Sequence, residues 1–400
     1  MSPPVIYLDS QDYSRFGDVL RGKADNELET LFANLADRKN RGEVIFAVSM
    51  PILGEILQYD PDFRETSFKK AEAVERLCGR WALAYPSRLV AAEVANAAIR
   101  RGDLPNSKEI SILSPDRYWF PNTADVFADL ADRMREGAAE RVSSLVLPTR
   151  VQRRQAKKAI RKFNPSKAAR EAAPELAETY GLPLSSITGS LVPFLSGRIS
   201  SEEASQRLFS AIAEPTKFVE TYFERIDTDR SLPAWMGKFG QNFHDLAAKF
   251  RDEMTPFLHQ EGARAILEAM LAKQSTELGR LALKFGEDDL TEFGIDEQLR
   301  TRLMDDVGIA SDVPACRIMG AIVPSYLRQI TGLSGTAAKI EKSVGGDLVH
   351  AFYLPHVSLW RGDRRFSDLA RKALPEYSKR IVSKLTDLPT AIDALNSGSG

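Results

Sequence analysis

Short apolar runs alternate with helical spacing at the start of the chain. An apolar, β-rich run at residues 5–8 stops at turn- and cap-forming residues, and helical spacing follows over residues 28–35. A second apolar run at 44–48 predicts another strand, and Pro51 follows it where the first turn of a helix tolerates proline. This order of strand, helix, strand and helix is typical of a parallel sheet covered by helices.

The middle of the chain shows helical periodicity only. Residues 63–101 predict two helices split at Tyr85-Pro86-Ser87, and residues 103–122 contain three prolines and predict an irregular connection. From 123 to 330 the helical pattern is broken by Pro and Gly, with no visible repeat. We therefore expect this block to be helical.

The strand and helix pattern returns near the end of the chain. Asp347 precedes a short predicted helix at 348–354, a strand follows at 356–360, another helix starts at about Ser367, and a last strand is expected at 380–383. The economical interpretation is one α/β domain with a central parallel sheet, built from both chain ends around a large all-helical insertion. The predicted boundaries are 1–102 for the N-terminal part, 103–330 for the insertion and 331–400 for the C-terminal part.

Composition narrows the function classes. Lys and Arg number 54 against 55 for Asp and Glu, so net charge alone would not drive nucleic-acid coating. Two cysteines, Cys78 and Cys316, exclude a disulfide framework and a cysteine-rich zinc site. The sequence has neither an apolar run of membrane-spanning length nor a signal-peptide pattern at its first residues. We expect a soluble, cytoplasmic protein with no membrane partner.

Four carboxylates lie where the predicted strands end or the next helices begin. In a parallel sheet such positions share one edge, and like charges placed together there favour a hard divalent cation with oxygen ligands, Mg²⁺ or Mn²⁺. Such an ion can polarise a phosphodiester and activate water. Each residue alone is more often a turn or cap residue, and Glu93 is a rival for one position. The candidate catalytic and metal-binding residues are Asp9, Glu55, Asp347 and Asp363.

The order of these residues resembles the motifs of the PIN-domain nucleases. Residues 5–13 look like the opening motif of that family, residues 49–56 like its second motif, and residues 346–366 like its closing pattern. The resemblance covers about the first 60 and the last 60 residues. Two positions depart from the pattern, because Gln11 stands where Asn is usual and Gly362 where a small polar residue is usual.

The resemblance implies a three-layer α/β/α PIN-like fold and a metal-dependent nuclease, usually acting on RNA. It implies that Asp9 and Asp363 are central ligands of Mg²⁺ or Mn²⁺ and that Asp347 and Glu55 bind directly or through water. Asp12 either joins this site or caps the following helix, and we favour the cap. A toxin with a neutralising partner also fits the resemblance.

A run of basic residues in the middle block suggests a nucleic-acid contact. Residues 150–170 contain no acidic residue, and a narrow apolar stripe leaves the positive charges on the rest of a helix. This pattern predicts a helix that binds RNA phosphates, with a solvated face as the alternative. The candidate nucleic-acid-binding residues are Arg150, Arg153, Arg154, Lys157, Lys158, Arg161 and Lys162.

Together these features predict an endoribonuclease that uses Mg²⁺ or Mn²⁺. The alternative is a catalytically silent PIN-like protein that binds RNA or a protein partner through its helical insertion. Single-stranded or structured DNA is a third substrate option, and a homodimer is left open. His350 is interpreted as a buried, hydrogen-bonded residue and not as a catalytic base.

Overall fold

The central feature of the fold is a small parallel sheet, seen here in a computed structural model. Its four strands have the order β2-β1-β5-β6 and comprise β1 (Val5–Tyr7), β2 (Ile45–Phe46), β5 (Leu359–Arg361) and β6 (Ile381–Val382). A separate antiparallel pair joins β3 (Ala82–Leu83) to β4 (Leu113–Ser114). The structure describes residues 2–57, 60–104, 108–116, 119, 127, 130–143, 149–180, 182–210, 212–224, 231–332, 340 and 343–398.

Segments from the two ends of the chain pair in the middle of this sheet. Ile6 pairs with Leu359 on one edge of β1 and with Phe46 on the other. Tyr7 pairs with Trp360, and both side chains are buried. The prediction of an α/β arrangement with a parallel sheet from both chain ends is confirmed.

The structure differs from the predicted strands at two places. Residues 63–101 were expected to form two helices only, but the strand β3 lies between these helices, and its residue Ala82 forms a parallel bridge with Val48. Such a two-residue strand depends on its tertiary partner, so periodicity could not reveal it. The strand expected at 356–360 begins only at Leu359, because the preceding helix continues into a 3₁₀ turn at Leu354–His356.

Helices account for most of the remaining chain that the structure describes. Pro51 lies in the first turn of α3 (Met50–Ile56), as predicted. The helix expected from about Ser367 begins earlier, as α20 (Arg364–Ala373), because Asp363 caps its first turn. Within the described residues, no helix is long and apolar enough to cross a membrane. The other helices around the sheet are α1 (Ser10–Leu20), α2 (Asn26–Asn40), α4 (Arg64–Cys78), α5 (Pro86–Arg101), α13 (Ser231–Met254), α14 (Ala263–Arg280), α15 (Leu283–Gly286), α16 (Glu297–Asp305), α17 (Ile309–Asp312), α18 (Pro314–Thr331), α19 (Val344–Ala351) and α21 (Leu388–Ser397).

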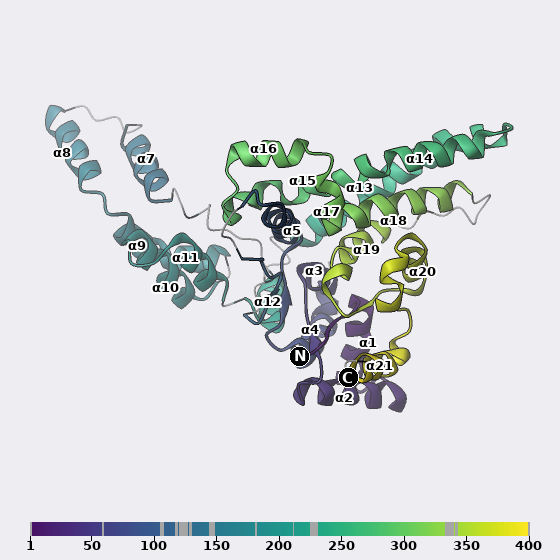
Figure 1. Cartoon of the computed structure of the whole chain (residues 1–400). Helices are drawn as coiled ribbons and strands as arrows, with labels where there is room; N and C mark the ends of the chain where they lie inside the picture. Colours follow the sequence, from purple (N-terminus) through teal and green to yellow (C-terminus); the bar gives the residue numbers. More distant parts are fainter. Residues whose placement is uncertain are drawn as a thin grey trace. The chain divides into compact units, whose positions relative to one another are not determined.

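The chain divides into two compact units. Unit 1 comprises Met1–Trp119 and Ile226–Gly400 and contains the sheet, and unit 2 comprises Phe120–Arg225 (Figure 1). The predicted insertion at 103–330 therefore spans all of unit 2 and also the helices from α13 to α18, which belong to unit 1. The helices of unit 2 are α7 (Leu130–Ser143), α8 (Arg150–Arg161), α9 (Pro165–Tyr180), α10 (Leu184–Leu195), α11 (Ser201–Phe209) and α12 (Pro215–Phe223).

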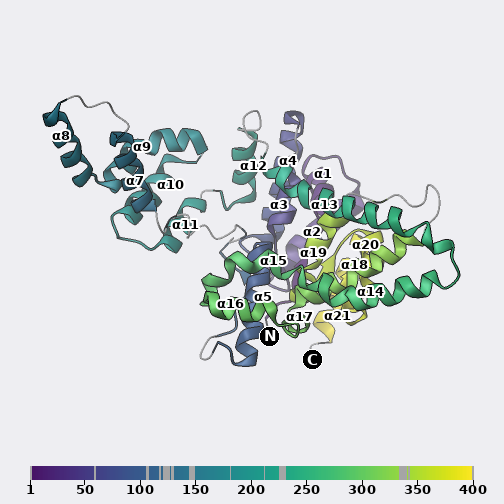
Figure 2. The same cartoon turned by 90° about the horizontal axis from the view of Figure 1, so that it is seen from above.

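Close helix packing joins the later helices of unit 1. Helices α14 and α18 run side by side in both views (Figures 1 and 2). A Cβ at Gly279 would lie 2.5 Å from the Cys316 carbonyl oxygen, and one at Gly320 would lie 2.7 Å from the Ser275 carbonyl oxygen. Glycine at both positions lets the two backbones approach to contact, which a larger side chain would prevent.

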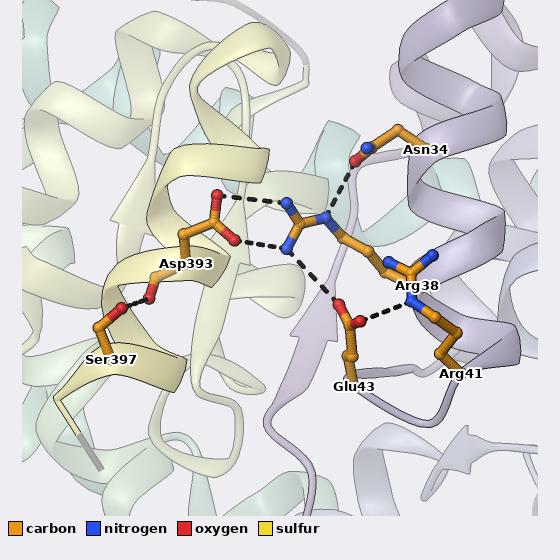
Figure 3. A network of polar contacts seen from close by, with 6 residues as sticks. All are labelled: Asn34, Arg38, Arg41, Glu43, Asp393 and Ser397. Atoms are coloured by element: carbon orange, nitrogen blue, oxygen red, sulfur yellow. Dashed lines mark hydrogen bonds and ion pairs between the residues drawn. The ribbon is translucent and has the colours of Figure 1, made fainter. Parts of the chain in front are cut away.

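A network of polar contacts joins the C-terminal helix α21 to helix α2 in the N-terminal part of the chain (Figure 3). The guanidinium of Arg38 on α2 bonds both carboxylate oxygens of Asp393 on α21, at 2.6 and 3.2 Å. Arg38 also donates to Asn34 and lies 3.7 Å from Glu43, which Arg41 contacts in turn. Because these pairs are exposed to solvent, we expect them to fix the position of α21 more than to stabilise the fold.

Candidate functional site

The candidate site lies where the direction of the chain crossovers reverses. From β1 the chain crosses through α1 and α2 to β2, and from β5 it crosses through α20 to β6 on the opposite side of the sheet. Because such crossovers are right-handed, two that leave in opposite directions place their helices on opposite faces of the sheet. The carboxyl ends of β1 and β5 therefore form the topological switch point, where open parallel sheets usually bind ligands.

Asp9 and Asp363 follow these two strands, and each caps a helix. Asp9 Oδ1 accepts a hydrogen bond from the Gln11 backbone N–H at 3.0 Å, at the start of α1. Asp363 Oδ1 accepts the backbone N–H groups of Arg365 and Phe366 at 2.7 and 3.0 Å, at the start of α20. Both residues therefore cap a helix, as expected for an aspartate that follows a strand. In both caps, the hydrogen bonds that the structure describes go to Oδ1.

Asp347 lies in the first turn of α19, and burial together with the other three carboxylates raises its pKa. Burial raises the pKa of Asp347, and the charges of Asp363, Asp9 and Glu55 contribute to a pKa of about 8. A Cβ built at the preceding residue, Gly346, would lie 3.3 Å from Glu55 Oε1. The Glu55 carboxylate therefore lies against the turn that carries Asp347. The four predicted residues form one electrostatically coupled group.

A chain of hydrogen bonds holds Glu55 in this group. Glu55 Oε1 is 3.0 Å from His350 Nε2, His350 Nδ1 is 2.6 Å from the Tyr7 hydroxyl, and that hydroxyl is 2.7 Å from Ser49 Oγ. Burial lowers the pKa of His350, but the nearby carboxylates, Glu55 first among them, raise it overall to about 9. The imidazolium therefore donates to Glu55 and to Tyr7, and Tyr7 donates to Ser49.

The same contact sets the charge of Glu55. Its side chain is 36% exposed, and although burial raises the pKa of Glu55, the His350 charge and hydrogen bonds from His350 and Ser10 lower it overall. Glu55 is therefore anionic at neutral pH while Asp347 holds a proton. The interpretation of His350 as a buried, hydrogen-bonded residue is confirmed.

Asp12 and Arg361 form a buried ion pair next to Asp9. Asp12 is fully buried, and its Oδ1 is 3.2 Å from Nη2 of Arg361, the last residue of β5. Burial raises the pKa of Asp12 to about 7, although Arg361 opposes that shift. Asp12 Oδ2 also accepts the Asp9 backbone N–H at 3.2 Å and completes a capping box at the start of α1. The expected cap is confirmed, with the pairing to Arg361 added.

The four carboxylates have the ligand type that a hard cation prefers, but in the described residues they are not grouped as a metal-binding cluster. Carboxylate oxygens are the ligands that Mg²⁺ and Mn²⁺ prefer, and the raised pKa of Asp347 reflects the charge repulsion that such a cation would relieve. Two cations of the chain itself, His350 and Arg361, already offset part of this negative charge. Among the residues that the structure describes, no three His, Cys, Asp or Glu side chains are grouped so that they could hold a metal ion.

Glu93 has other partners. This residue of α5 is 2% exposed, accepts the Ala315 backbone N–H at 2.8 Å, and lies 2.5 Å from His356 Nε2. Ala315 lies in the first turn of α18, so the carboxylate satisfies a free N–H at that helix end. Of the two glutamates considered from the sequence, Glu55 is the one coupled to Asp347.

Trp360 explains the departure at Gly362. A Cβ at Gly362 would lie 2.2 Å from Trp360 Cη2 and 2.5 Å from Cζ3, so the buried indole occupies that space. The indole Nε1 donates to the His350 carbonyl oxygen at 3.0 Å. The ring therefore joins β5 to α19, and glycine directly before Asp363 makes room for it.

The predicted basic helix forms as α8 in unit 2. Arg150, Arg154 and Lys158 follow one another at four-residue intervals, so they share a face of this helix, and their side chains are exposed, as is that of Lys162. The side chains of Arg153, Lys157 and Arg161 lie outside the described residues. The described part of α8 thus presents a positively charged face to solvent.

Tyr7, Ser49 and Arg361 take part in these contacts but were not among the residues selected from the sequence. A charged residue at the end of an apolar strand, as in Leu359–Arg361, is a usable signal, because a buried guanidinium requires a partner. No such signal pairs Tyr7 with His350, which lies 343 positions away.

Comparison with protein-family models, with curated proteins and with solved structures finds no match to this chain.

Proposed function

We propose that this protein is a metal-dependent nuclease, an endoribonuclease with a PIN-like α/β/α fold that hydrolyses RNA phosphodiester bonds. The observation that carries the proposal is the position of Asp9 and Asp363 at the carboxyl ends of two adjacent parallel strands, coupled to a third carboxylate, Asp347, whose pKa is raised to about 8. Carboxylates gathered at a switch point fit a ligand of opposite charge.

The residues of the site have separate tasks in this proposal. Asp9, Glu55, Asp347 and Asp363 would hold Mg²⁺ or Mn²⁺, and the bound cation would supply polarisation of the phosphodiester and a lowered pKa of the attacking water. Asp9 and Asp363 are fixed in position by their helix caps. His350 keeps Glu55 anionic and oriented, and Asp347, whose pKa is raised, would have to lose its proton to serve as a ligand.

Helix α8 supports RNA as the substrate. Its exposed, positively charged face fits the phosphate backbone of a polynucleotide, which binds mainly through electrostatic contacts. We assign it a role in substrate binding by unit 2, with single-stranded or structured DNA as the other substrates to compare. A cytoplasmic location is part of the proposal, and a homodimer is left open.

The second candidate is a catalytically silent PIN-like protein that binds RNA or a protein partner. One observation favours it: His350 and Arg361 place two positive charges of the chain itself within the acidic group. Because these charges offset the carboxylates, the group can persist without a metal ion. The two candidates differ in whether Mn²⁺ binds.

The test uses Asp→Asn substitutions at helix caps. Asparagine caps a helix as well as aspartate does but is a weaker ligand for hard cations, so Asp9→Asn and Asp363→Asn should fold normally and lose Mg²⁺- or Mn²⁺-dependent RNA cleavage. Asp25→Asn, at the cap of α2 where Asp25 accepts the Leu28 N–H, is the matched control and should cleave like wild type.

Calorimetric titration with Mn²⁺ accompanies the cleavage assay. Heat of binding in the wild type that disappears in Asp9→Asn supports the nuclease. Wild-type protein that neither binds Mn²⁺ nor cleaves RNA or single-stranded DNA would contradict the nuclease and favour the silent interaction protein.

A further inference from the structure

A positively charged cleft lies at the carboxyl end of the edge strand β6. It has a volume of about 400 Å³ and is lined by Ile381, Val382 and Ser383, by side chains of α20, and by the segment that leads into α21. Because β6 is parallel to β5, its carboxyl end lies at the same edge of the sheet as Asp363. The cleft and the acidic group therefore share that edge.

The charged residues of the cleft carry a net positive charge. Arg364, Arg371, Lys379 and Lys384 line it, against the carboxylates of Asp368 and Asp387. Arg371 is already held, since it donates to Asp368 at 3.2 Å and to the Ile381 carbonyl oxygen at 2.8 Å. No ion pair joins Arg364, Lys379 or Lys384 to another residue in the described part of the chain. Three cations are therefore free to bind an anion.

Ser383 adds a second, independent observation. Its hydroxyl oxygen is buried and has no hydrogen-bond partner among the described residues. A buried hydroxyl without a partner costs free energy, on the order of 1–3 kcal/mol in general, which a bound acceptor or donor can recover. Ser383 lines the same cleft as the free cations. A hydroxyl together with Lys and Arg side chains is the donor set that proteins use for phosphate groups.

Strand pairing places this cleft close to the acidic group. Arg361 and Val382 pair as the last residues of β5 and β6, so Asp363 and Lys384 each lie two residues beyond the carboxyl end of adjacent strands. Adjacent strands lie about 4.8 Å apart. Arg364, which lines the cleft, directly follows Asp363 in the sequence. A ligand that extends from the acidic group along the sheet edge would therefore reach the cleft.

We propose that this cleft binds a backbone phosphate of the polynucleotide substrate, next to the bond that the acidic group cleaves. The inference rests on the proposed nuclease function and adds a binding site to it. Arg364, Lys379 and Lys384 hold the phosphate through charge, and Ser383 donates a hydrogen bond to it.

The test measures RNA binding without cleavage. A fluorescein-labelled oligouridine is titrated with full-length protein in EDTA, and anisotropy gives the affinity over a series of salt concentrations. The test variant is Lys379→Gln with Lys384→Gln, because both side chains are exposed and unpaired within the described chain. The matched control is Lys273→Gln with Lys284→Gln, which removes the same charge from exposed positions on α14 and α15.

Each phosphate contact to a single strand contributes about 0.7 to the slope of log affinity against log salt. The test variant should therefore lower the slope by about 1.4 and weaken binding by about 25-fold at ~0.1 M salt, while the control leaves both unchanged. Equal behaviour of the two variants, absence of wild-type binding, or equal displacement of RNA by oligoglutamate would overturn the inference. Weaker binding by the test variant in a protein that never cleaves RNA would keep the phosphate site and remove the nuclease.

Discussion

The raised pKa of Asp347 makes the stability of this protein depend on pH in a direction that can be tested. A carboxyl whose pKa is higher in the folded than in the unfolded chain binds its proton more tightly when folded, so stability falls as pH rises between the two values. For Asp347 these values are 3.8 and about 8. We therefore expect the free energy of unfolding to decrease from pH 5 to pH 8 in the absence of divalent cations.

The size of this effect follows from proton linkage. At pH 5 the folded group is almost fully protonated and the unfolded group almost fully ionised, and at pH 8 the folded group is half ionised. Integration between these limits, at about 1.4 kcal/mol for each pKa unit, gives a loss on the order of 4 kcal/mol from Asp347 alone. Asp347→Asn keeps the shape of the side chain and removes the titration, so its free energy of unfolding should lack this part of the pH dependence.

The assay is urea denaturation in EDTA at a series of pH values for the wild type, Asp347→Asn and the control Asp25→Asn, which removes an exposed carboxylate from the cap of α2. The quantity that matters is the change between pH 5 and pH 8 in the difference between variant and wild type. A decrease of several kcal/mol, on the order of 4, for the wild type relative to Asp347→Asn, with little change for the control, supports the coupling. Parallel curves for all three proteins would refute it.

Divalent cations extend the same measurement. If Asp347 becomes a ligand only after it loses its proton, Mn²⁺ should stabilise the wild type more at pH 8 than at pH 5, because binding to the folded state alone adds stability by mass action. Stabilisation of equal size at both pH values would contradict a ligand role for Asp347 and leave its coupling to the other carboxylates intact.

Two further predictions concern the packing of the site and the basic helix. Gly362→Ala forces a Cβ into the Trp360 ring and should destabilise the protein by about 1–3 kcal/mol in urea denaturation, whereas Gly189→Ala, whose Cβ meets nothing within 4 Å, should not destabilise it; equal stability of the two variants would contradict the packing argument. Charge reversal by Arg154→Glu with Lys158→Glu on α8 should weaken RNA binding and flatten its salt dependence. Unchanged RNA affinity would assign α8 to a solvated face.

Several parts of the fold and the site followed from local sequence patterns. The strands at residues 5–7 and 45–46 were evident from apolar runs that end in cap or turn residues, and Pro51 marked the start of α3. Asp9 and Asp363 could be chosen because each follows a strand and precedes a helix. These features depend on neighbours within a few residues, so one segment of sequence contains the whole signal.

Other features depended on partners that are distant along the chain. β3 exists because Val48 and the residues of β4 pair with it, and the boundary between the two units depends on which helices pack on the sheet. Periodicity shows that a helix has an apolar face but not which surface that face covers. For this reason the sequence suggested a single insertion from 103 to 330, while α13 to α18 belong to the unit that contains the sheet.

The charge state of the site was decided by tertiary structure alone. The sequence placed four carboxylates at one edge of a sheet, but which of them carries a proton depends on burial and on the charges that surround it. His350 keeps Glu55 anionic, while Asp347 is left with the repulsion of three carboxylates. Arg361 and Asp12 come from opposite ends of the chain. Coulomb energy depends on separation in space and on the local dielectric, and neither quantity can be read from positions along the sequence.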